Sequence, residues 1–397
     1  MTLTTERLLS RSELVDVARD VAELAWSRRE EADANRRLPD DVIEALVNSG
    51  LTKLWNQKRW GGYEADPMTV LDVGREISRG SAALGWLYSL TSFHTWYLAF
   101  ASEELQSEIF RDNPEALVSD SFAPVGTVEP VSGGYTVSGQ WRFVSGCEWA
   151  SWVAVGGIAS VVEGEPPELQ LFFLPRADFT IHDDWHTLGL RGTASRSIKV
   201  ESVFVPQHRV LALGRLASPQ PRGAVADQSP LYRLPLMTTQ GLAIITASIG
   251  VAQRMLDEYT DSTKKRVRWL DPGAQQREAP SAQLTLAKAA TQWDATWALA
   301  QSYAQEGWER ALAGNWTLTE QERARYFSWR AYVAATNVDI CDELFANSGA
   351  MALFDSNPLQ QLFRDAHATA AHVGADRGDA YTSRGRVAMG FPGHPFH

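Results

Sequence analysis

His94 lies in the stretch TSFHTWYLAF, next to Phe93 and close to Trp96 and Tyr97. An imidazole titrates near neutral pH, so it can accept a proton from an O–H or N–H group, and aromatic side chains suit the wall of a pocket for a planar molecule. We therefore expect these four residues to bind a substrate, with His94 as an acid–base group. The alternative is a core histidine bonded to a backbone carbonyl.

Other kinds of reactive centre are not indicated. The only two cysteines, Cys147 and Cys341, stand far apart without a CxxC or Cys/His spacing, so neither a zinc site nor a disulfide framework is expected. No GxGxxG or Walker sequence follows a strand pattern, so the chain shows no site for NAD(P)H. With 37 basic and 48 acidic side chains the formal charge is −11, which disfavours nucleic acid and anionic lipid as partners.

The composition is that of a folded protein, with 44% apolar and 21% charged residues. No uninterrupted apolar run approaches the ~20 residues needed to span a bilayer. A cytoplasmic location is the corresponding expectation.

Three regions with different periodicity follow one another. Residues 1–116 show apolar positions at three- and four-residue steps, which predicts a helical domain with one of its helices at 82–100. Residues 117–216 contain short segments of period two, rich in Val, Phe, Trp and Thr, which predict a small β domain. The stretch 217–230 reads as a linker. Residues 231–397 return to long helical patterns, at 234–260, 281–312, 319–347 and 360–372, which predict a four-helix bundle. Because these helices exceed the usual length, other subunits are expected to cover part of them.

Four short stretches carry a family resemblance. DWHTLGLRGT at 184–193 with the following SIKVESVFVP resembles the GMRGS and VxVP signature of acyl-CoA dehydrogenases, and GQWRFVSG at 139–146 is similar to their flavin-contacting strand. FRDAH at 363–367 and PDDVIEALVNSGL at 39–51 are similar to other helices of that family. The resemblance implies an acyl-CoA dehydrogenase-like fold, mainly α with a small β domain of barrel or sandwich form.

One position departs from the dehydrogenases. Val373 stands where most of them carry the glutamate that removes the substrate's α-proton, and valine has no lone pair for that step. His372 next to it, and His94, match histidines of the flavin-dependent hydroxylases in this superfamily, typified by p-hydroxyphenylacetate hydroxylase. The resemblance thus implies the oxygenase component of a two-component monooxygenase.

The family chemistry assigns further roles. Reduced FMN or FAD and O₂ would form a C4a-hydroperoxyflavin that hydroxylates a small phenolic or indolic substrate. His372 would supply a proton and hold the oxygen chain, and Ser145 would contact the flavin near N5. Trp185, Ser119 and Ser121 would line the flavin pocket, although which of the two serines points inward is open.

Arg266, in KKRVR, matches a phosphate-binding arginine that often reaches the flavin of a neighbouring subunit. The alternative for such a basic run is a solvated surface. Without an NAD(P)H site the protein would need a separate NAD(P)H:flavin reductase, and the superfamily suggests a homotetramer. FMN or FAD, dimer or tetramer, and the exact substrate stay open.

Other functions also remain open at this point. An N- or S-oxygenase of the same branch would have less need of His94. An acyl-CoA dehydrogenase with a displaced base would bind oxidised FAD tightly. A helical scaffold that has lost its cofactor would leave Ser145, His94 and His372 dispensable.

Overall fold

The computed structural model describes residues 8–395 apart from 161–163, 165–166, 218–224, 226–227, 269–272 and 316. Most of the expected linker at 217–230 therefore lies outside the described residues. The N-terminal helices are α1 Arg11–Ser27, α2 Arg29–Asn35, α3 Asp40–Asn48, α4 Pro67–Gly80, α5 Ala82–Leu98 and α6 Glu103–Phe110.

Eight strands follow in the described part of the chain: β1 Val118–Ser121, β2 Thr127–Val131, β3 Gly134–Val144, β4 Trp152–Ala159, β5 Glu168–Pro175, β6 Thr180–His182, β7 Arg196–Pro206 and β8 Val210–Ala212. They form two four-stranded sheets, with the orders β1-β4-β5-β8 and β2-β3-β7-β6. Apolar residues from both sheets share one core that includes Trp141, Val155 and Phe172. The β domain is therefore a small sandwich.

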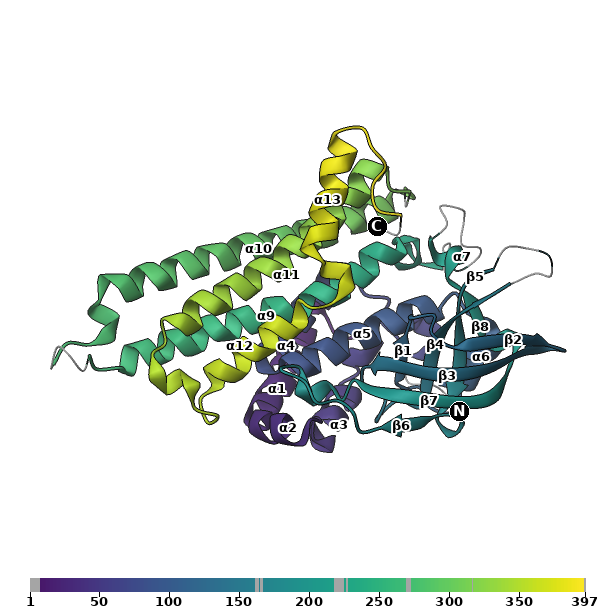
Figure 1. The fold of residues 1–397 in the computed structure, drawn as a ribbon, viewed down its shortest axis with the longest axis horizontal. Coiled ribbons are helices and arrows are strands. Elements are labelled where there is room, and N and C mark those ends of the chain that lie inside the picture. Colours follow the sequence, from purple (N-terminus) through teal and green to yellow (C-terminus); the bar gives the residue numbers. More distant parts are fainter. Residues whose placement is uncertain are drawn as a thin grey trace.

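The last region contains a short helix and then long ones: α7 Leu213–Ala217, α9 Leu236–Lys265, α10 Pro280–Leu312, α11 Glu320–Ala346, α12 Pro358–Thr369 and α13 Arg377–Ala388. Figure 1 shows α9 to α12 side by side as an elongated bundle, with the sandwich at the opposite end of the molecule and α13 projecting from the side. By length and composition α9 could cross a membrane, but 83% of its most apolar stretch is buried in the protein.

Helix α5 lies between the bundle and the sandwich (Figure 1). Fifteen of its 17 residues are buried, so it has almost no polar face, as expected for a helix enclosed on all sides. It begins where Ser81 accepts a hydrogen bond from the backbone N–H of Leu84. This central helix carries Trp86, His94 and Tyr97, and it therefore positions three of the groups that matter below.

Two elements differ from the sequence-based expectation. A helix was expected to continue through His372, but α12 ends at Thr369, and His372 instead caps a single turn at Val373–Ala375. Helix α13 was not expected because Gly378 and Gly385 lower its intrinsic propensity. It is held by the Asp376 side chain, which caps its N-terminus, and by packing against α11.

Candidate active site

The turn after β3 is irregular, and it places Ser145 in the interior. The pairing of β3 with β7 shifts register between Trp141 and Val144, and Phe143 adopts a left-handed φ of 61°. This bulge turns Phe143 outward, where 70% of its surface is exposed, while Ser145 beyond it is only 8% exposed. The strand end thus combines an exposed aromatic ring with a buried hydroxyl.

The Ser145 hydroxyl belongs to a chain of hydrogen bonds. Its Oγ accepts from Trp86 Nε1 at 3.2 Å and lies 2.7 Å from Ser195 Oγ. Ser195 Oγ in turn lies 2.6 Å from Thr193 Oγ1, which donates to the carbonyl oxygen of Leu190 at 2.8 Å.

The hydrogen bonds between these hydroxyl groups all run in one direction, because each hydroxyl has a single proton to donate. The carbonyl of Leu190 can only accept, so Thr193 gives its proton there and must accept from Ser195. Ser195 then accepts from Ser145. The hydroxyl of Ser145 therefore donates into the protein, and its remaining lone pair is free to accept one further hydrogen bond.

The loop that carries Leu190 is fixed to α12 by a buried carboxylate. Asp365 Oδ1 accepts a hydrogen bond from the backbone N–H of Leu190 at 2.7 Å, and burial raises the pKa of Asp365 to about 7. Gly189 is required at this contact, since a Cβ there would lie 2.2 Å from the carbonyl oxygen of Arg364. The RDA and LGLRGT stretches thus meet directly.

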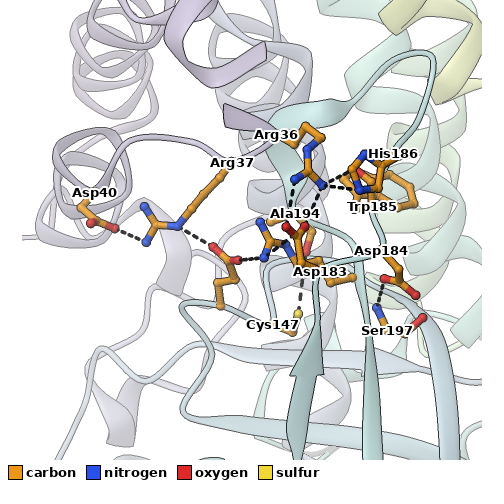
Figure 2. Close-up of polar contacts among 12 residues, drawn as sticks. Arg36, Arg37, Asp40, Cys147, Asp183, Asp184, Trp185, His186, Ala194 and Ser197 are labelled. Carbon is orange, nitrogen blue, oxygen red and sulfur yellow. Dashed lines mark hydrogen bonds and ion pairs between the residues drawn. The ribbon is translucent and has the colours of Figure 1, made fainter. Parts of the chain in front are cut away.

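Ion pairs hold the other side of the same loop to the N-terminal helices. Figure 2 shows Arg36 reaching Asp183 at 2.7 Å, with contacts to His186 at 3.2 Å and to the carbonyl of Trp185 at 3.4 Å. In the same view Arg37 joins Asp40. The contacts of Arg36 fix the backbone on which Trp185 stands.

Trp185 lies beside the exposed ring of Phe143. Their centroids are 6.0 Å apart in an edge-to-face arrangement, and Trp185 Nε1 donates to the carbonyl of Leu190 at 3.1 Å. The two rings form an aromatic surface next to the turn that holds Ser145.

His372 reaches the same region from the bundle. Its ring centroid is 5.9 Å from that of Trp86, the residue that donates to Ser145. Burial lowers the pKa of His372, the charge of Arg330 acts in the same direction, and Asp120 opposes them. The ring is therefore neutral at neutral pH. Because Nδ1 accepts from the backbone N–H of Gly374 at 3.0 Å, the single ring proton is on Nε2.

A second cluster lies on the helix side of β1. His94 Nδ1 is 2.5 Å from the carbonyl oxygen of Val118, and its Nε2 lies 3.0 Å from Asp120 Oδ2. The hydroxyl of Tyr97 donates to the same carboxylate oxygen at 3.0 Å. His94 is 2% exposed. The alternative interpretation, a core histidine bonded to a backbone carbonyl, therefore fits Nδ1, whereas Nε2 faces a carboxylate.

Comparisons with known proteins identify the family of the chain. The family model "Acyl-CoA dehydrogenase, N-terminal domain" matches residues 10–112, and "Acyl-CoA dehydrogenase, C-terminal domain" matches residues 242–377. The oxygenase subunit HsaA of a flavin-dependent monooxygenase from Rhodococcus jostii is 35% identical over 92% of this chain and 95% of its own length.

Further relatives point the same way. The oxygenase component of the FADH(2)-dependent resorcinol hydroxylase from a Rhizobium species is 31% identical over 95% of this chain and 94% of its own length. The crystal structure of HsaA from Mycobacterium tuberculosis superposes with a TM-score of 0.90, at 30% identity, over 98% of this chain and all of that one. The chain belongs to the oxygenase components of flavin-dependent monooxygenases. The acyl-CoA dehydrogenase-like fold expected from the sequence is confirmed.

This oxygenase component brings together several of the residues singled out in its sequence. Ser145, Ser119 and His372 meet around Trp86, and Ser119 Oγ donates to the carbonyl of Ser145 at 2.7 Å. Ser121 faces the same strand, where its hydroxyl donates to the carbonyl of Arg142 at 3.0 Å. Both serines therefore point the same way, and Ser119 is the more buried of the two.

Other expected residues lie deeper or elsewhere. Phe93 and Trp96 are at most 2% exposed and stack on each other, so they support the cluster from behind. Arg266 follows α9 at the end of the bundle remote from the sandwich, where it donates to the carbonyl of Ser348 at 2.6 Å (Figure 1). Within one chain Arg266 does not approach Ser145.

Sequence reasoning missed four members of the site. Trp86 gave no signal because nearly all residues of its helix are buried, so one buried tryptophan does not stand out. Asp120 stands between the two serines that were singled out, and its alternation with them along β1 was the available clue. Thr193 was visible only as the last residue of the LGLRGT stretch, and Ser195 lies just beyond it.

Proposed function

We propose that this oxygenase component uses reduced FMN or FAD and O₂ to hydroxylate a small phenolic or indolic compound. The proposal rests on one observation above all, the contact that both Ser145 and His372 make with Trp86. Ser145 offers a lone pair, and His372 Nε2–H makes no hydrogen bond to any of the residues described.

These residues fit a flavin ring. The exposed face of Phe143 beside Trp185 suits a flat aromatic group, which would cover it. Reduced flavin carries a proton on N5, and the inward direction of the hydroxyl chain makes Ser145 an acceptor suited to that N–H. When bound, the reduced flavin supplies two electrons and delivers one oxygen atom of O₂ to the substrate.

His372 provides a hydrogen-bond donor, Nε2–H, next to Trp86. A neutral imidazole with its proton on Nε2 can give a hydrogen bond to oxygen and can regain a proton from solvent. The apolar surroundings of Trp86 restrict water, which would otherwise carry protons for the wasteful release of hydrogen peroxide.

The flavin would arrive from a separate NAD(P)H:flavin reductase, as the names "oxygenase subunit" and "oxygenase component" of the relatives imply for those proteins. A homotetramer is part of the proposal. Exposed apolar side chains at Met351, Leu353 and Phe354 follow the Ser348 carbonyl that Arg266 contacts. Burial of this surface against another subunit would let Arg266 hold the phosphate of that subunit's flavin.

The proposal is tested by combining the protein with an unrelated NAD(P)H:flavin reductase, NADH, flavin and a panel of phenols and indoles. Mass spectrometry should find a product that is heavier by one oxygen atom only when both proteins, flavin and air are present. Oxidation of an acyl-CoA thioester by the protein and a dye, without oxygen, would instead support a dehydrogenase.

A further inference from the structure

Asp120 is a carboxylate in apolar surroundings. It stands on β1 with its side chain 15% exposed, and its neighbours on α5 approach a single oxygen, Oδ2. The hydroxyl of Tyr97 donates to that atom at 3.0 Å, and His94 Nε2 lies at 3.0 Å. Burial and the negative charge of Asp120 raise the pKa of Tyr97 well above its ordinary value, so Tyr97 keeps the proton with which it donates.

Contacts at both ring nitrogens fix the imidazole of His94 beside Asp120. The carbonyl of Val118 accepts only, so His94 Nδ1 carries a proton and donates to it. Nε2 lies 3.0 Å from Asp120 Oδ2 in an oblique approach that does not form an aligned hydrogen bond. The imidazole therefore occupies the side of the carboxylate on which Oδ2 lies.

His94 and Asp120 differ in whether a ligand can contact their polar atoms. His94 Nε2 has no accessible surface, and Nδ1 is occupied by the Val118 carbonyl. Asp120 Oδ1 receives no hydrogen bond from any residue in the described ranges, and it is not among the fully buried polar atoms. Oδ1 is thus the polar atom of this cluster that an incoming molecule can contact.

The residues around Asp120 favour the approach of an aromatic molecule. Tyr97 packs against Phe122, which follows β1, with ring centroids 5.9 Å apart, so aromatic surface lies beside the carboxylate. Asp120 is also next to Ser119 on β1, and the Ser119 hydroxyl donates to the carbonyl of Ser145 at 2.7 Å. Because Trp86 donates to the hydroxyl of Ser145, an aromatic molecule that reaches Oδ1 would be close to the groups around Trp86.

We propose that Asp120 binds the substrate, with Oδ1 accepting the hydrogen bond of a phenolic hydroxyl. This rests on the function proposed above and names its substrate class more closely. His94 and Tyr97 are positioning residues that hold Oδ2 and leave Oδ1 free. The hydrogen bond to a carboxylate increases electron density on the ring, which favours attack by an electrophilic oxygen. A methyl ether of the same ring has no proton to donate and is rejected.

Binding can be measured without turnover. Protein loaded with reduced FMN in the absence of oxygen is titrated with 4-fluorophenol and, separately, with 4-fluoroanisole, and ¹⁹F NMR gives the two dissociation constants. The wild-type protein should prefer the phenol by about tenfold or more, as expected for a hydrogen bond to a charged group. In Asp120→Asn this preference should fall to near one, while Asp112→Asn, an exposed control, should keep it.

Tyr97→Phe removes one donor to Oδ2 and leaves the carboxylate in place, so it should lose only part of the preference. If Asp120→Asn does not fold, this variant decides the matter. An unchanged preference in a folded variant, equal binding of both probes by the wild type, or binding of neither, overturns the assignment of Asp120. Oxygen insertion into another aromatic compound would still stand in each of these cases, so the two proposals fail separately.

Discussion

The imidazole of His372 lies against the indole of Trp86, with ring centroids 5.9 Å apart. The same indole donates its N–H to Ser145 at 3.2 Å. Trp86 on α5 therefore joins a residue of the bundle to a residue of the sandwich, and the two halves of the proposed site depend on one side chain.

Trp86→Phe should uncouple oxygen use from hydroxylation. Phenylalanine keeps a ring beside His372 but cannot donate to Ser145, whose hydroxyl then loses one of the two bonds that orient it. The ratio of hydroxylated product to hydrogen peroxide should fall several-fold, with little change in the melting temperature. An unchanged ratio would show that the indole N–H is only structural.

His372→Ala should also release more peroxide and should alter the rate at which oxygen reoxidises the reduced flavin. The reason is the loss of the Nε2–H donor beside Trp86. His367→Ala is the matched control, because His367 bonds the carbonyl of Phe363 at 2.9 Å and pairs with Asp342 instead. Equal reoxidation rates and equal peroxide yields in both variants would remove His372 from the mechanism.

Thr193→Val should make the protein bind oxidised flavin more tightly relative to reduced flavin. Without the Thr193 hydroxyl, Ser195 has no acceptor and can donate to Ser145, whose proton then turns toward the flavin. Oxidised flavin has a bare N5 that accepts this proton, whereas reduced flavin does not.

The quantity to measure is the ratio of dissociation constants for oxidised and reduced FMN. It should fall about five- to tenfold in Thr193→Val, the size of one ordinary hydrogen bond. Thr187→Val is a control in the same loop, because its hydroxyl bonds only the carbonyl of Gly189. A ratio that stays constant in both variants would contradict the direction assigned to the hydroxyl chain.

Asp365 should make stability depend on pH. Its pKa in the folded protein, about 7, lies above the value near 4 of an unfolded aspartate. The folded state therefore holds this proton more tightly than the unfolded state does. The contribution of Asp365 to the free energy of unfolding is fully present below pH 4 and is lost as the pH rises through 7. Between pH 5 and pH 8 the unfolding free energy should fall by on the order of 3 kcal/mol more in the wild type than in Asp365→Asn.

Urea titrations at the two pH values check this, with Asp355→Asn as an exposed control. The asparagine oxygen can still accept the Leu190 N–H, so the loop should stay in place. Parallel pH profiles for wild type and Asp365→Asn would mean that this carboxylate is ionised in the folded protein.

Much of the fold could be predicted from periodicity, because long amphipathic helices and alternating strands leave a strong pattern. The boundaries of α5 and α10 were predicted to within two residues of those observed. The end of α12 was misplaced, since ATAAH continues a helical composition and the turn at His372 depends on a side-chain cap to Gly374.

The site was only partly predictable, for a different reason. Ser145 and His372 were found because they stand in motifs, but Trp86 contributes through a contact with both that no local pattern encodes. His94 was chosen by its residue type, its aromatic neighbours and its match to a histidine of the hydroxylases, and none of these says where its nitrogens point. Both nitrogens face protein acceptors, so any role toward a substrate passes through Asp120.

The most direct test of the account supplies the flavin without a reductase. Chemically reduced FMN is mixed with the protein and a phenolic substrate under argon, ¹⁸O₂ is admitted, and the product is analysed by mass spectrometry. We predict one ¹⁸O atom in each product molecule. Product that carries oxygen only from water, or product formed before ¹⁸O₂ is admitted, would contradict a monooxygenase that works on reduced flavin made elsewhere.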